Sequence, residues 1–568
     1  MKRKQFYKAD RIRDIKELLK RAENLYSDRI VFKELGPHKE VHEYTYSRMV
    51  EDVNALGTKL LKMGLKGKHI ALLGENSYSW VISYLAVVNG VGVSIPLDKE
   101  LMEDDIAKLL IRGDADVIIC SEQFGPEMKG IIERCPKLET CIVMNTSRDY
   151  PDFHVLEELI AEGRKLLQEG NRNYLDRMID EDCMCEIVFT SGTTGANKGV
   201  MLSHRNIMSV IYGAMNVIKA DRVSFSVLPI NHTYECSCHI LGGIYSGITI
   251  CFNDSLKRVV ENIKRFKPNM TLMVPLFIES IYKSIWKESE KQGLDGHLRY
   301  GIWFSNLLRK FGIDKRRYFF KPILEKFGGN LDQIVCGGAP LRQEVAKGLS
   351  DLGIDVLNGF GITECAPLVA CNMRSWNKHG SVGRIMPNCR VRIDKPNESG
   401  IGEIQVNGDN VMLGYYKDPE STKVAFTEDG WFRTGDLGYI DRDEFLYING
   451  REKNLIILSN GKNVYPEEIE DVIIRKMPYV KEVVVYAKPK IVGDDSINAC
   501  IYFDEEFLLD HGILSCREKL NLDMKMVNRS LPGYKRVSNV LISEIEFVKT
   551  TTKKIKRDLI LEGSYQNA

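Results

Sequence analysis

The stretch Thr190-Ser-Gly-Thr-Thr-Gly-Ala-Asn-Lys-Gly199 follows the apolar run Glu186-Ile-Val-Phe-Thr190 and decides the fold of this chain. A strand that runs into a loop of Gly, Ser and Thr offers hydroxyls and backbone N–H groups to phosphate oxygens. The loop is not a Walker A motif, which needs Gly directly before Lys and Ser or Thr directly after it. We therefore predict a different phosphate-binding loop, with a ligand-free turn as the alternative. Its candidate residues are Thr190, Ser191, Gly192, Thr193, Thr194, Gly195 and Lys198.

Apolar runs alternate with helical patterns around this loop. The runs at 69–74 and 116–120, with a helical pattern at 46–63, predict βαβ units and a parallel sheet. Two further apolar runs, at 333–336 and 354–357, end in glycine-rich or small polar loops. Strand ends of this kind bind ligands in doubly wound sheets, so an α/β fold with a site at these ends is expected.

Glycine and proline punctuate the chain from about 380 to 450, which predicts a small β-rich subdomain. After Gly450 a mixed pattern follows, with helices expected around 466–476 and 512–529. We therefore expect an N-terminal domain at 1–450 and a C-terminal domain at 451–568.

Composition excludes several classes of protein. The 568 residues are 44% hydrophobic and 28% charged, which rules out collagen-like and wholly disordered chains. Lys and Arg number 79 against 78 Asp and Glu, so no general field attracts nucleic acid or an anionic membrane. We predict no nucleic-acid partner.

The fourteen cysteines favour a reducing, cytoplasmic compartment. The pairs Cys183/Cys185 and Cys236/Cys238 lack the spacing of zinc ligands and are expected on strands. The apolar stretch at 80–97 is interrupted by polar residues and glycines, so we expect a buried helix followed by a strand rather than a membrane span.

Two segments leave peripheral membrane contact open. Residues 1–21 are basic and lead into apolar residues at helical spacing, which predicts an amphipathic helix that lies on a membrane or docks on its own domain. Residues 299–327 hold eight aromatic and eight basic residues against two acidic ones. They are expected to meet lipid or to form an ordinary packed insertion with extended cationic side chains.

Five more motifs follow the loop in order. They are Gly337-Gly-Ala-Pro340, Gly359-Phe-Gly-Ile-Thr-Glu364, Thr434-Gly-Asp436, Gly450-Arg-Glu-Lys453 and Lys549-Thr-Thr-Thr-Lys-Lys-Ile-Lys-Arg557. With the loop, they resemble the adenylate-forming (AMP-binding) superfamily, and most closely its long-chain fatty acyl-CoA synthetases. The resemblance implies a large N-terminal domain of two doubly wound sheet subdomains and a small β-barrel-like subdomain, followed by a smaller, mobile α+β domain.

The resemblance implies roles for these motifs, and their chemistry suits those roles. Glycines bring backbone close to a flat adenine ring, Glu364 offers a hard oxygen for Mg²⁺, and Thr363 offers a hydroxyl for the α-phosphate. Asp436 is expected to accept the ribose hydroxyls and Arg451 to reinforce that hold; a turn aspartate is the alternative. The remaining expected nucleotide-binding residues are Gly338, Ala339, Pro340, Gly359, Phe360 and Gly361, where Phe360 replaces the more usual tyrosine.

Lys554 matches the family lysine that reaches the carboxylate and the α-phosphate, and we expect it to be catalytic with Lys198, Thr363 and Glu364. Lys553 stands where the family usually has glycine, and a solvated basic tail is the alternative. The resemblance further implies that the C-terminal domain turns about Lys453 and brings Gly461 to the site for thioester formation.

Asn231-His-Thr-Tyr-Glu235 resembles the segment that places His232 and Tyr234 near the substrate carboxylate, with a core histidine as the alternative. We expect a fatty acid to be activated by ATP with Mg²⁺ and passed to coenzyme A. A carrier-protein acceptor, an inactive nucleotide-binding relative and a homodimer remain open.

Overall fold

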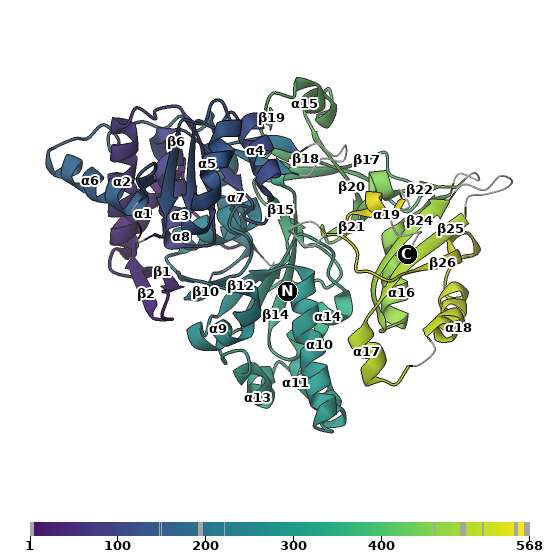
Figure 1. Cartoon of the computed structure of the whole chain (residues 1–568). Coiled ribbons are helices and arrows are strands. Elements are labelled where there is room, and N and C mark those ends of the chain that lie inside the picture. The colour runs from purple at the N-terminus through teal and green to yellow at the C-terminus, as the bar shows by residue number, and fades with distance from the viewer. Residues whose placement is uncertain are drawn as a thin grey trace. The chain divides into compact units, whose positions relative to one another are not determined.

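The computed structural model describes residues 5–146, 148, 150–190, 197–220, 222–458, 462–488, 496–513, 516–549 and 555–561. These residues form two compact units, drawn in Figure 1. Unit 1 comprises 1–391 and 406–432, and unit 2 comprises 392–405 and 433–568. Each unit is described separately below.

Unit 1 contains an eight-stranded sheet in the order β19-β9-β8-β4-β3-β5-β6-β7 among its described residues. Strands β4, β3, β5, β6 and β7 run parallel, which confirms the expected parallel sheet, whereas β8 and β9 form an antiparallel hairpin. The strands are β3 His69–Leu73, β4 Val93–Leu97, β5 Val117–Ser121, β6 Thr140–Met144, β7 His154–Val155, β8 Met184–Thr190, β9 Lys198–Ser203 and β19 Gly414–Tyr415.

One face of this sheet packs against α4 (Glu103–Arg112) and α5 (Gly125–Arg134). Alternate strand residues such as Leu73, Ile95 and Ile118 meet helix residues such as Leu110 and Ile131 in one buried core. Helices α2 (Tyr46–Lys62) and α6 (Leu156–Gln168) also pack together (Figure 1). The expected helix and strand at 80–97 are confirmed as α3 (Tyr78–Ala86) and β4, joined by a π-helical turn at Val87–Val91.

A second, nine-stranded sheet of unit 1 has the order β16-β15-β14-β13-β12-β10-β11-β1-β2. Its inner strands β11, β10, β12, β13 and β14 are parallel, as a doubly wound sheet requires. The strands are β1 Ile30–Leu35, β2 Val41–Thr45, β10 Val223–Ser226, β11 Thr249–Phe252, β12 Met270–Met273, β13 Gln333–Cys336, β14 Asp355–Gly361, β15 Leu368–Cys371 and β16 Arg384–Ile385.

The carboxyl ends of the two sheets meet at Asn76, which follows β3. Its amide donates to Ser226 Oγ at 2.9 Å and to the Leu228 carbonyl at 2.7 Å, and its Oδ1 accepts from Ile230 N at 3.1 Å. One side chain therefore fixes the turn that leads from β10 toward His232.

The amphipathic N-terminal segment docks on its own unit. Helix α1 (Ile15–Tyr26) is capped by Asp14, and Ile15, Leu18, Leu19 and Ala22 are buried. Lys16 Nζ donates to two carbonyl oxygens, those of Tyr174 and Arg177. Because its apolar face is already covered, this helix matches the own-domain alternative.

The expectation that the CxC pairs lie on strands is wrong for Cys236 and Cys238, whereas of the other pair Cys185 lies on strand β8 and Cys183 does not. Cys236 and Cys238 lie in the π-helix η3 (Tyr234–Leu241), and Cys183 precedes β8, which begins at Met184. Within the helix, the buried Glu235 and His239 pair at 2.8 Å four residues apart, and His239 Nε2 lies 2.8 Å from Ser224 Oγ. That buried polar pair needs helical spacing, which a strand cannot supply.

The segment expected to be β-rich forms a four-stranded sheet in the order β17-β18-β20-β21. Its strands are β17 Cys389–Asp394, β18 Gly402–Gly408, β20 Phe432–Ile440 and β21 Leu446–Arg451.

Unit 2 also has a three-stranded sheet, β24 (Val480–Lys488), β25 (Ser496–Phe503) and β26 (Val537–Ser543), with one antiparallel and one parallel pairing. Helices α16 (Pro466–Lys476) and α18 (Cys516–Arg529) pack on it through Ile469, Ile473 and Val527. This arrangement confirms the expected α+β C-terminal part.

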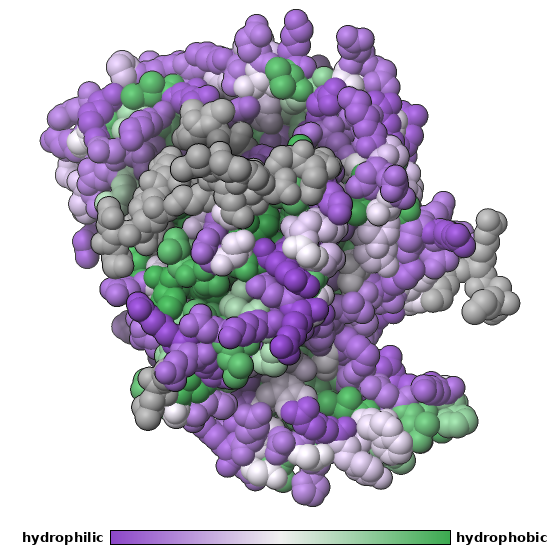
Figure 2. Space-filling view, turned by 90° about the vertical axis from the view of Figure 1, so that its right-hand side faces the viewer, coloured by the Kyte–Doolittle hydropathy of each residue, from purple (hydrophilic) through white to green (hydrophobic). Residues whose placement is uncertain are grey.

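The surface and the helices of the described residues bear on whether the chain could cross a membrane. The face in Figure 2 is mostly hydrophilic, with hydrophobic residues in patches between charged ones. No helix in the described part of the chain combines the length and hydropathy that a bilayer-spanning segment requires.

Candidate active site

The ends of the predicted phosphate-binding loop are fixed by the hairpin of β8 and β9. Thr190, the last residue of β8, pairs with Lys198, the first residue of β9. Ser191, Gly192, Thr193, Thr194 and Gly195 lie outside the described residues. The hairpin therefore holds Lys198 next to Thr190, where the loop joins the two strands.

Strand β19 places Tyr415 beside this lysine. Tyr415 pairs with Val200 of β9, and Tyr416 N donates to the Gly199 carbonyl at 2.7 Å. Lys198 Nζ lies 4.8 Å from the centroid of the Tyr415 ring, within the range of a cation–π contact. Tyr415 was not predicted from the sequence, in which an aromatic residue after Gly414 was its only signal.

Glu364 is tethered to the same segment. It lies in the turn Thr363–Cys365 that follows β14, and its Oε1 accepts from the Tyr415 hydroxyl at 3.0 Å. The carbonyl of Glu364 accepts from Met412 N at 2.8 Å. Lys198 and Glu364, predicted from separate motifs, therefore both contact Tyr415.

The helix after β9 fixes the segment that carries Tyr415. Ser203 caps α7 (His204–Val217) in a capping box with Asn206. The Asn206 amide donates to the carbonyls of Asp409 and Val411, at 2.9 and 2.8 Å. Strand pairing and these two hydrogen bonds thus hold residues 409–415 against β9.

Charge around Tyr415 favours its neutral form. Burial raises the pKa of Tyr415, and the Glu364 carboxylate raises it further. The hydroxyl therefore remains a donor to Glu364 across the physiological pH range. Nearby, hydrogen bonds from Ser421 lower the pKa of Asp418, and the charge of Lys198 contributes.

Replacing Tyr415 by phenylalanine should lower kcat/KM for the adenylation that the sequence motifs lead us to expect by about ten- to a hundredfold, because a hydrogen bond to a charged group is worth about 1.5–3 kcal/mol. The ring that faces Lys198 is retained, so the change removes only the donor that positions Glu364. The matched control is Tyr416→Phe, which breaks a 2.7 Å bond to Asp114 instead. Equal kinetics for Tyr415→Phe and the unmodified protein, measured by pyrophosphate exchange, would contradict this role.

The two glycine-rich motifs end adjacent strands, β13 and β14. Gly337 lies so close to Tyr234 that an added Cβ would be 3.0 Å from its ring, and Gly338 has φ +86°. A Cβ on Gly361 would lie 2.4 Å from the Pro367 carbonyl oxygen, so backbone packing demands glycine there. Phe360 is buried. Gly338, Ala339 and Pro340 are exposed, and Gly359 and Gly361 are half-buried.

The structure brings Tyr234, predicted near the acyl group, to the first of these motifs. Its hydroxyl donates to the Val335 carbonyl at 3.0 Å. His232 lies in the turn before η3, where its carbonyl accepts from Cys236 N at 2.9 Å. Tyr234 thereby joins the segment 231–235, which the sequence predicts to be near the substrate, to the end of β13.

The strand that leads into the loop carries a buried carboxyl group. Glu186 of β8 is 1% exposed and accepts from the Tyr84 hydroxyl at 3.3 Å. Burial raises the pKa of Glu186 to about 8. The folded protein therefore keeps this proton up to about pH 8, whereas an ordinary glutamate releases it near pH 4.5.

Between those two pH values the folded state binds more protons, so its stability should fall as pH rises, by up to about 1.4 kcal/mol per unit. Glu186→Gln removes the titration. The free energy of unfolding, measured in denaturant, should fall less with pH in this variant than in the unmodified protein. The difference between the two, variant minus unmodified, should therefore grow from pH 5 to pH 8. The exposed Glu127→Gln variant is the control and should show no such trend. A constant difference at all pH values would contradict the prediction.

Unit 2 holds the remaining candidates. Asp436 of β20 pairs with Arg451 of β21, and Arg451 Nε lies 2.7 Å from Asp436 Oδ1. Asp436 N also donates to Thr434 Oγ1 at 3.0 Å. Lys453 is exposed in the short helix Glu452–Asn454.

Gly461 and Lys554 lie outside the described residues. The residues that flank 550–554 are described: Lys549 and Ile555 form an antiparallel bridge. Arg557 is held by an ion pair with Glu470. Because Lys549 also forms an ion pair with Glu482, both ends of the basic segment are fixed to unit 2.

The donor set fits Mg²⁺ bound together with a nucleotide. Within the described ranges, no group of three or more His, Cys, Asp or Glu is placed to hold a metal ion by itself. Mg²⁺ usually takes one or two carboxylates and completes its shell with water and substrate phosphates, so Glu364 alone meets the protein's part of that requirement.

Solved structures of adenylate-forming enzymes share this fold. The chain superposes on the anthranilate CoA ligase AuaEII, bound to anthranoyl-AMP, with a TM-score of 0.76, 18% identity, and 99% and 98% coverage of the two chains. For ATP-bound MatB from Rhodopseudomonas palustris the TM-score is 0.74 at 22% identity, with 97% and 99% coverage. These two structures therefore establish the fold of the chain.

The chain belongs to the AMP-binding enzyme family, whose sequence model matches residues 19–416. It is 28% identical over 477 residues to the rat long-chain-fatty-acid–CoA ligase ACSBG1, covering 79% of this chain and 65% of the relative. It is 27% identical over 501 residues to fatty acyl-CoA synthetase A of Dictyostelium discoideum, covering 80% and 70%. The match thus spans just under two thirds of the length of the rat relative.

Proposed function

We propose that this protein activates a fatty acid with ATP and transfers the acyl group to coenzyme A. The observation that carries the proposal is the meeting of Lys198 and Glu364 at Tyr415, beside the ends of the loop at 191–197. A cation and a carboxylate held together at such a loop suit a nucleotide phosphate with its metal ion. The names of the relatives, long-chain-fatty-acid–CoA ligase and fatty acyl-CoA synthetase, favour a fatty acid.

In the first half-reaction a carboxylate oxygen of the fatty acid attacks the α-phosphorus of ATP. The bond from that phosphorus to the bridging oxygen breaks, and pyrophosphate leaves with the electron pair. Two anions meet in this step, so Lys198, the loop N–H groups and Lys554 would stabilise the developing charge, with Thr363 as donor to the α-phosphate. Glu364 would hold Mg²⁺ together with the phosphates, and the ion would supply further charge neutralisation.

In the second half-reaction the coenzyme A thiol, after losing its proton to solvent, attacks the acyl carbon through sulfur; the bond from that carbon to the AMP oxygen breaks, and AMP leaves with the electron pair. Asp436, oriented by Arg451, would hold the ribose through both steps. We propose that a turn about Lys453 exchanges Lys554 for the segment around Gly461 between the steps. His232 and Tyr234 are the proposed neighbours of the substrate carboxylate.

Pyrophosphate–ATP exchange over a panel of carboxylic acids, from acetate to long-chain fatty acids, tests the proposal. Exchange is expected with fatty acids alone, and AMP with a thioester once coenzyme A is added. Exchange followed by transfer only to a phosphopantetheine carrier would assign the carrier alternative. That alternative has some support, because an adenylation and carrier didomain of carboxylic acid reductase is among the similar folds. Absence of exchange with every acid would overturn the proposal and favour an inactive relative.

A further inference from the structure

Five aromatic side chains of unit 1 form a continuous exposed cluster on α11 (Asp295–Lys310) and α12 (Arg316–Phe319). The exposed fractions are 65% for Tyr300, 58% for Trp303, 37% for Phe304, 76% for Tyr318 and 39% for Phe319. The ring centroids of Trp303, Tyr300, Phe304, Phe319 and Tyr318 lie 5.6, 6.5, 6.0 and 5.8 Å apart in that order. We call this cluster the aromatic patch.

The patch is not the side of the insertion that packs on the protein. Other residues of the same segment do that: Leu298, Phe320, Leu324 and Phe327 are buried. Arg316 secures α12 by an ion pair with Asp355 at 2.9 Å. The segment is therefore already attached to unit 1, and its aromatic patch is left facing solvent, where large apolar clusters mark interaction sites.

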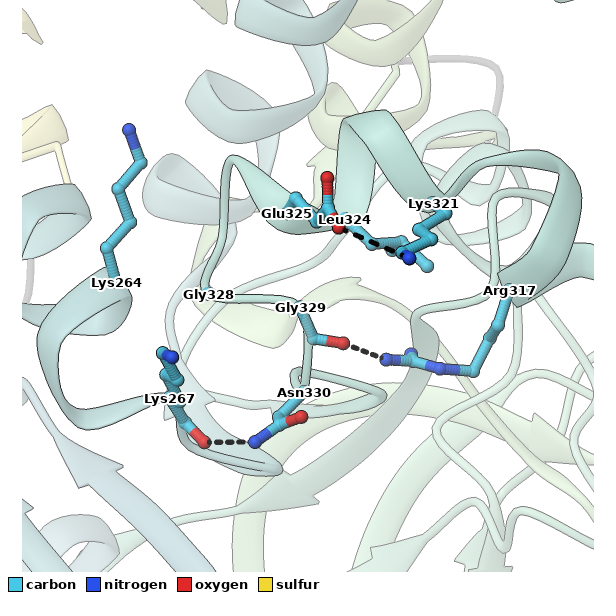
Figure 3. A pocket seen from close by; sticks show the side chains of 9 residues that line it. All are labelled: Lys264, Lys267, Arg317, Lys321, Leu324, Glu325, Gly328, Gly329 and Asn330. Atoms are coloured by element: carbon cyan, nitrogen blue, oxygen red, sulfur yellow. Dashed lines mark hydrogen bonds and ion pairs between the residues drawn. The ribbon is translucent and has the colours of Figure 1, made fainter.

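A basic hollow of roughly 580 Å³ adjoins the patch. Figure 3 shows Lys264, Lys267, Arg317 and Lys321 around it, with Glu325 as the one acidic residue of its lining. Arg317 donates to the Gly329 carbonyl at 2.6 Å, and Lys321 lies 3.7 Å from Glu325. Lys264 and Lys267 are exposed, so the hollow keeps a net positive charge.

The hollow and the patch share one short piece of chain. Arg317 precedes Tyr318 directly, and Lys321 follows Phe319 by two residues, at the start of α13 (Lys321–Glu325; Figure 1). Two residues of chain span at most about 7 Å between Cα atoms. The patch and the hollow are therefore built on the same short stretch of chain, and together they offer the aromatic and cationic side chains that bind a lipid headgroup region.

We propose that this surface docks on an anionic lipid bilayer, with the aromatic patch at headgroup depth and a lipid phosphate in the basic hollow. Trp and Tyr prefer that depth because they have apolar rings with polar edges. A second copy of the chain suits the surface less well, because a two-fold contact would bring each positive hollow toward its own image. The proposal does not depend on which acid is activated.

Co-sedimentation of the full chain with vesicles tests the proposal. Binding is expected to vesicles of phosphatidylcholine with phosphatidylglycerol, to be much weaker with phosphatidylcholine alone, and to fall as salt is raised. The variant Trp303→Ser with Tyr318→Ser should reduce binding about tenfold or more. Each of Lys264→Ser, Lys267→Ser and Lys321→Ser should reduce it about fivefold, because a lysine near an anionic surface contributes about 1 kcal/mol.

The matched control is Met102→Ser with Met178→Ser, which removes two exposed apolar side chains of unit 1 elsewhere and should leave binding unchanged. Thermal unfolding checks that each variant is folded. Trp303→Phe should retain binding but lose part of the blue shift of tryptophan fluorescence on vesicles.

Unchanged vesicle binding in the aromatic and lysine variants would overturn the proposal. So would a patch variant that converts a dimer to a monomer without affecting vesicles, which would assign the surface to a second copy. Because binding is measured without ATP or acid, failure here is distinct from failure of the proposed ligase activity.

Discussion

Replacing Glu364 by glutamine should lower the rate of acyl-adenylate formation by about 10²–10³-fold. Glutamine retains an acceptor for the Tyr415 hydroxyl, which lies 3.0 Å from Glu364 Oε1, but removes the negative charge. Loss of one preorganised electrostatic contact at a transition state typically costs this much. The measurement is pyrophosphate–ATP exchange with a fatty acid, repeated across Mg²⁺ concentrations.

If Glu364 holds the metal ion, the variant should need more Mg²⁺ to reach half of its own maximal rate. Glu420→Gln is the control, because this exposed carboxylate lies in α15 (Pro419–Ala425), just beyond Tyr415. It should change neither the exchange rate nor its dependence on Mg²⁺. An unaltered exchange rate in Glu364→Gln would remove Glu364 from the proposed mechanism. A lower rate with an unaltered Mg²⁺ requirement would leave it a role without the metal ion.

Replacing Lys554 by alanine should reduce adenylation about 10³-fold, whereas Lys553→Ala should retain most of the rate. In the sequence both residues lie between Lys549 and Ile555, which form a bridge, and Arg557, which is ion-paired with Glu470, follows shortly after. From its register with Ile555, Lys556 and Arg557 in the family resemblance, we propose Lys554 as the catalytic lysine. The positive charge of Lys554 would stabilise the approach of the substrate carboxylate to the negatively charged α-phosphate. This approach of two anions is the main electrostatic barrier of the first half-reaction, so loss of the charge should slow it.

Thioester formation from a synthetic acyl-adenylate separates the two half-reactions. Lys554→Ala should still use the acyl-adenylate, because the proposed second step does not require this lysine. If Lys553→Ala loses adenylation and Lys554→Ala does not, the two assignments must be exchanged. If both retain it, the basic segment is only a solvated tail.

The sequence predicts local elements well where burial and end signals agree. Strand β13 and helix α16 begin and end where the pattern places them, at 333–336 and 466–476. Helix α16 has Pro466 at its first position, Glu467 and Glu468 in its first turn and Arg475 in its last, and all of these favour a helix over the same span.

Contacts between distant parts of the chain could not be predicted in this way. Tyr415 and Glu364 are 51 residues apart, and the pairing of β9 with β19, together with the hydrogen bonds of Asn206, brings the tyrosine to the site. The helix at 234–241 was missed because its buried Glu235–His239 pair is stabilised by Ser224 of another element. In both cases tertiary contacts decide the local structure, and no spacing in the sequence records them.

The two-residue strand β19 has a consequence beyond the placement of Tyr415. It is the outermost member of its sheet and occupies the side of β9 that β8 leaves open. Unprotected borders of this kind recruit strands from other molecules and cause aggregation. The segment that carries Tyr415 therefore also covers part of the edge of β9. A substitution that detaches β19 from β9 should lower the solubility of the protein as well as its catalytic rate.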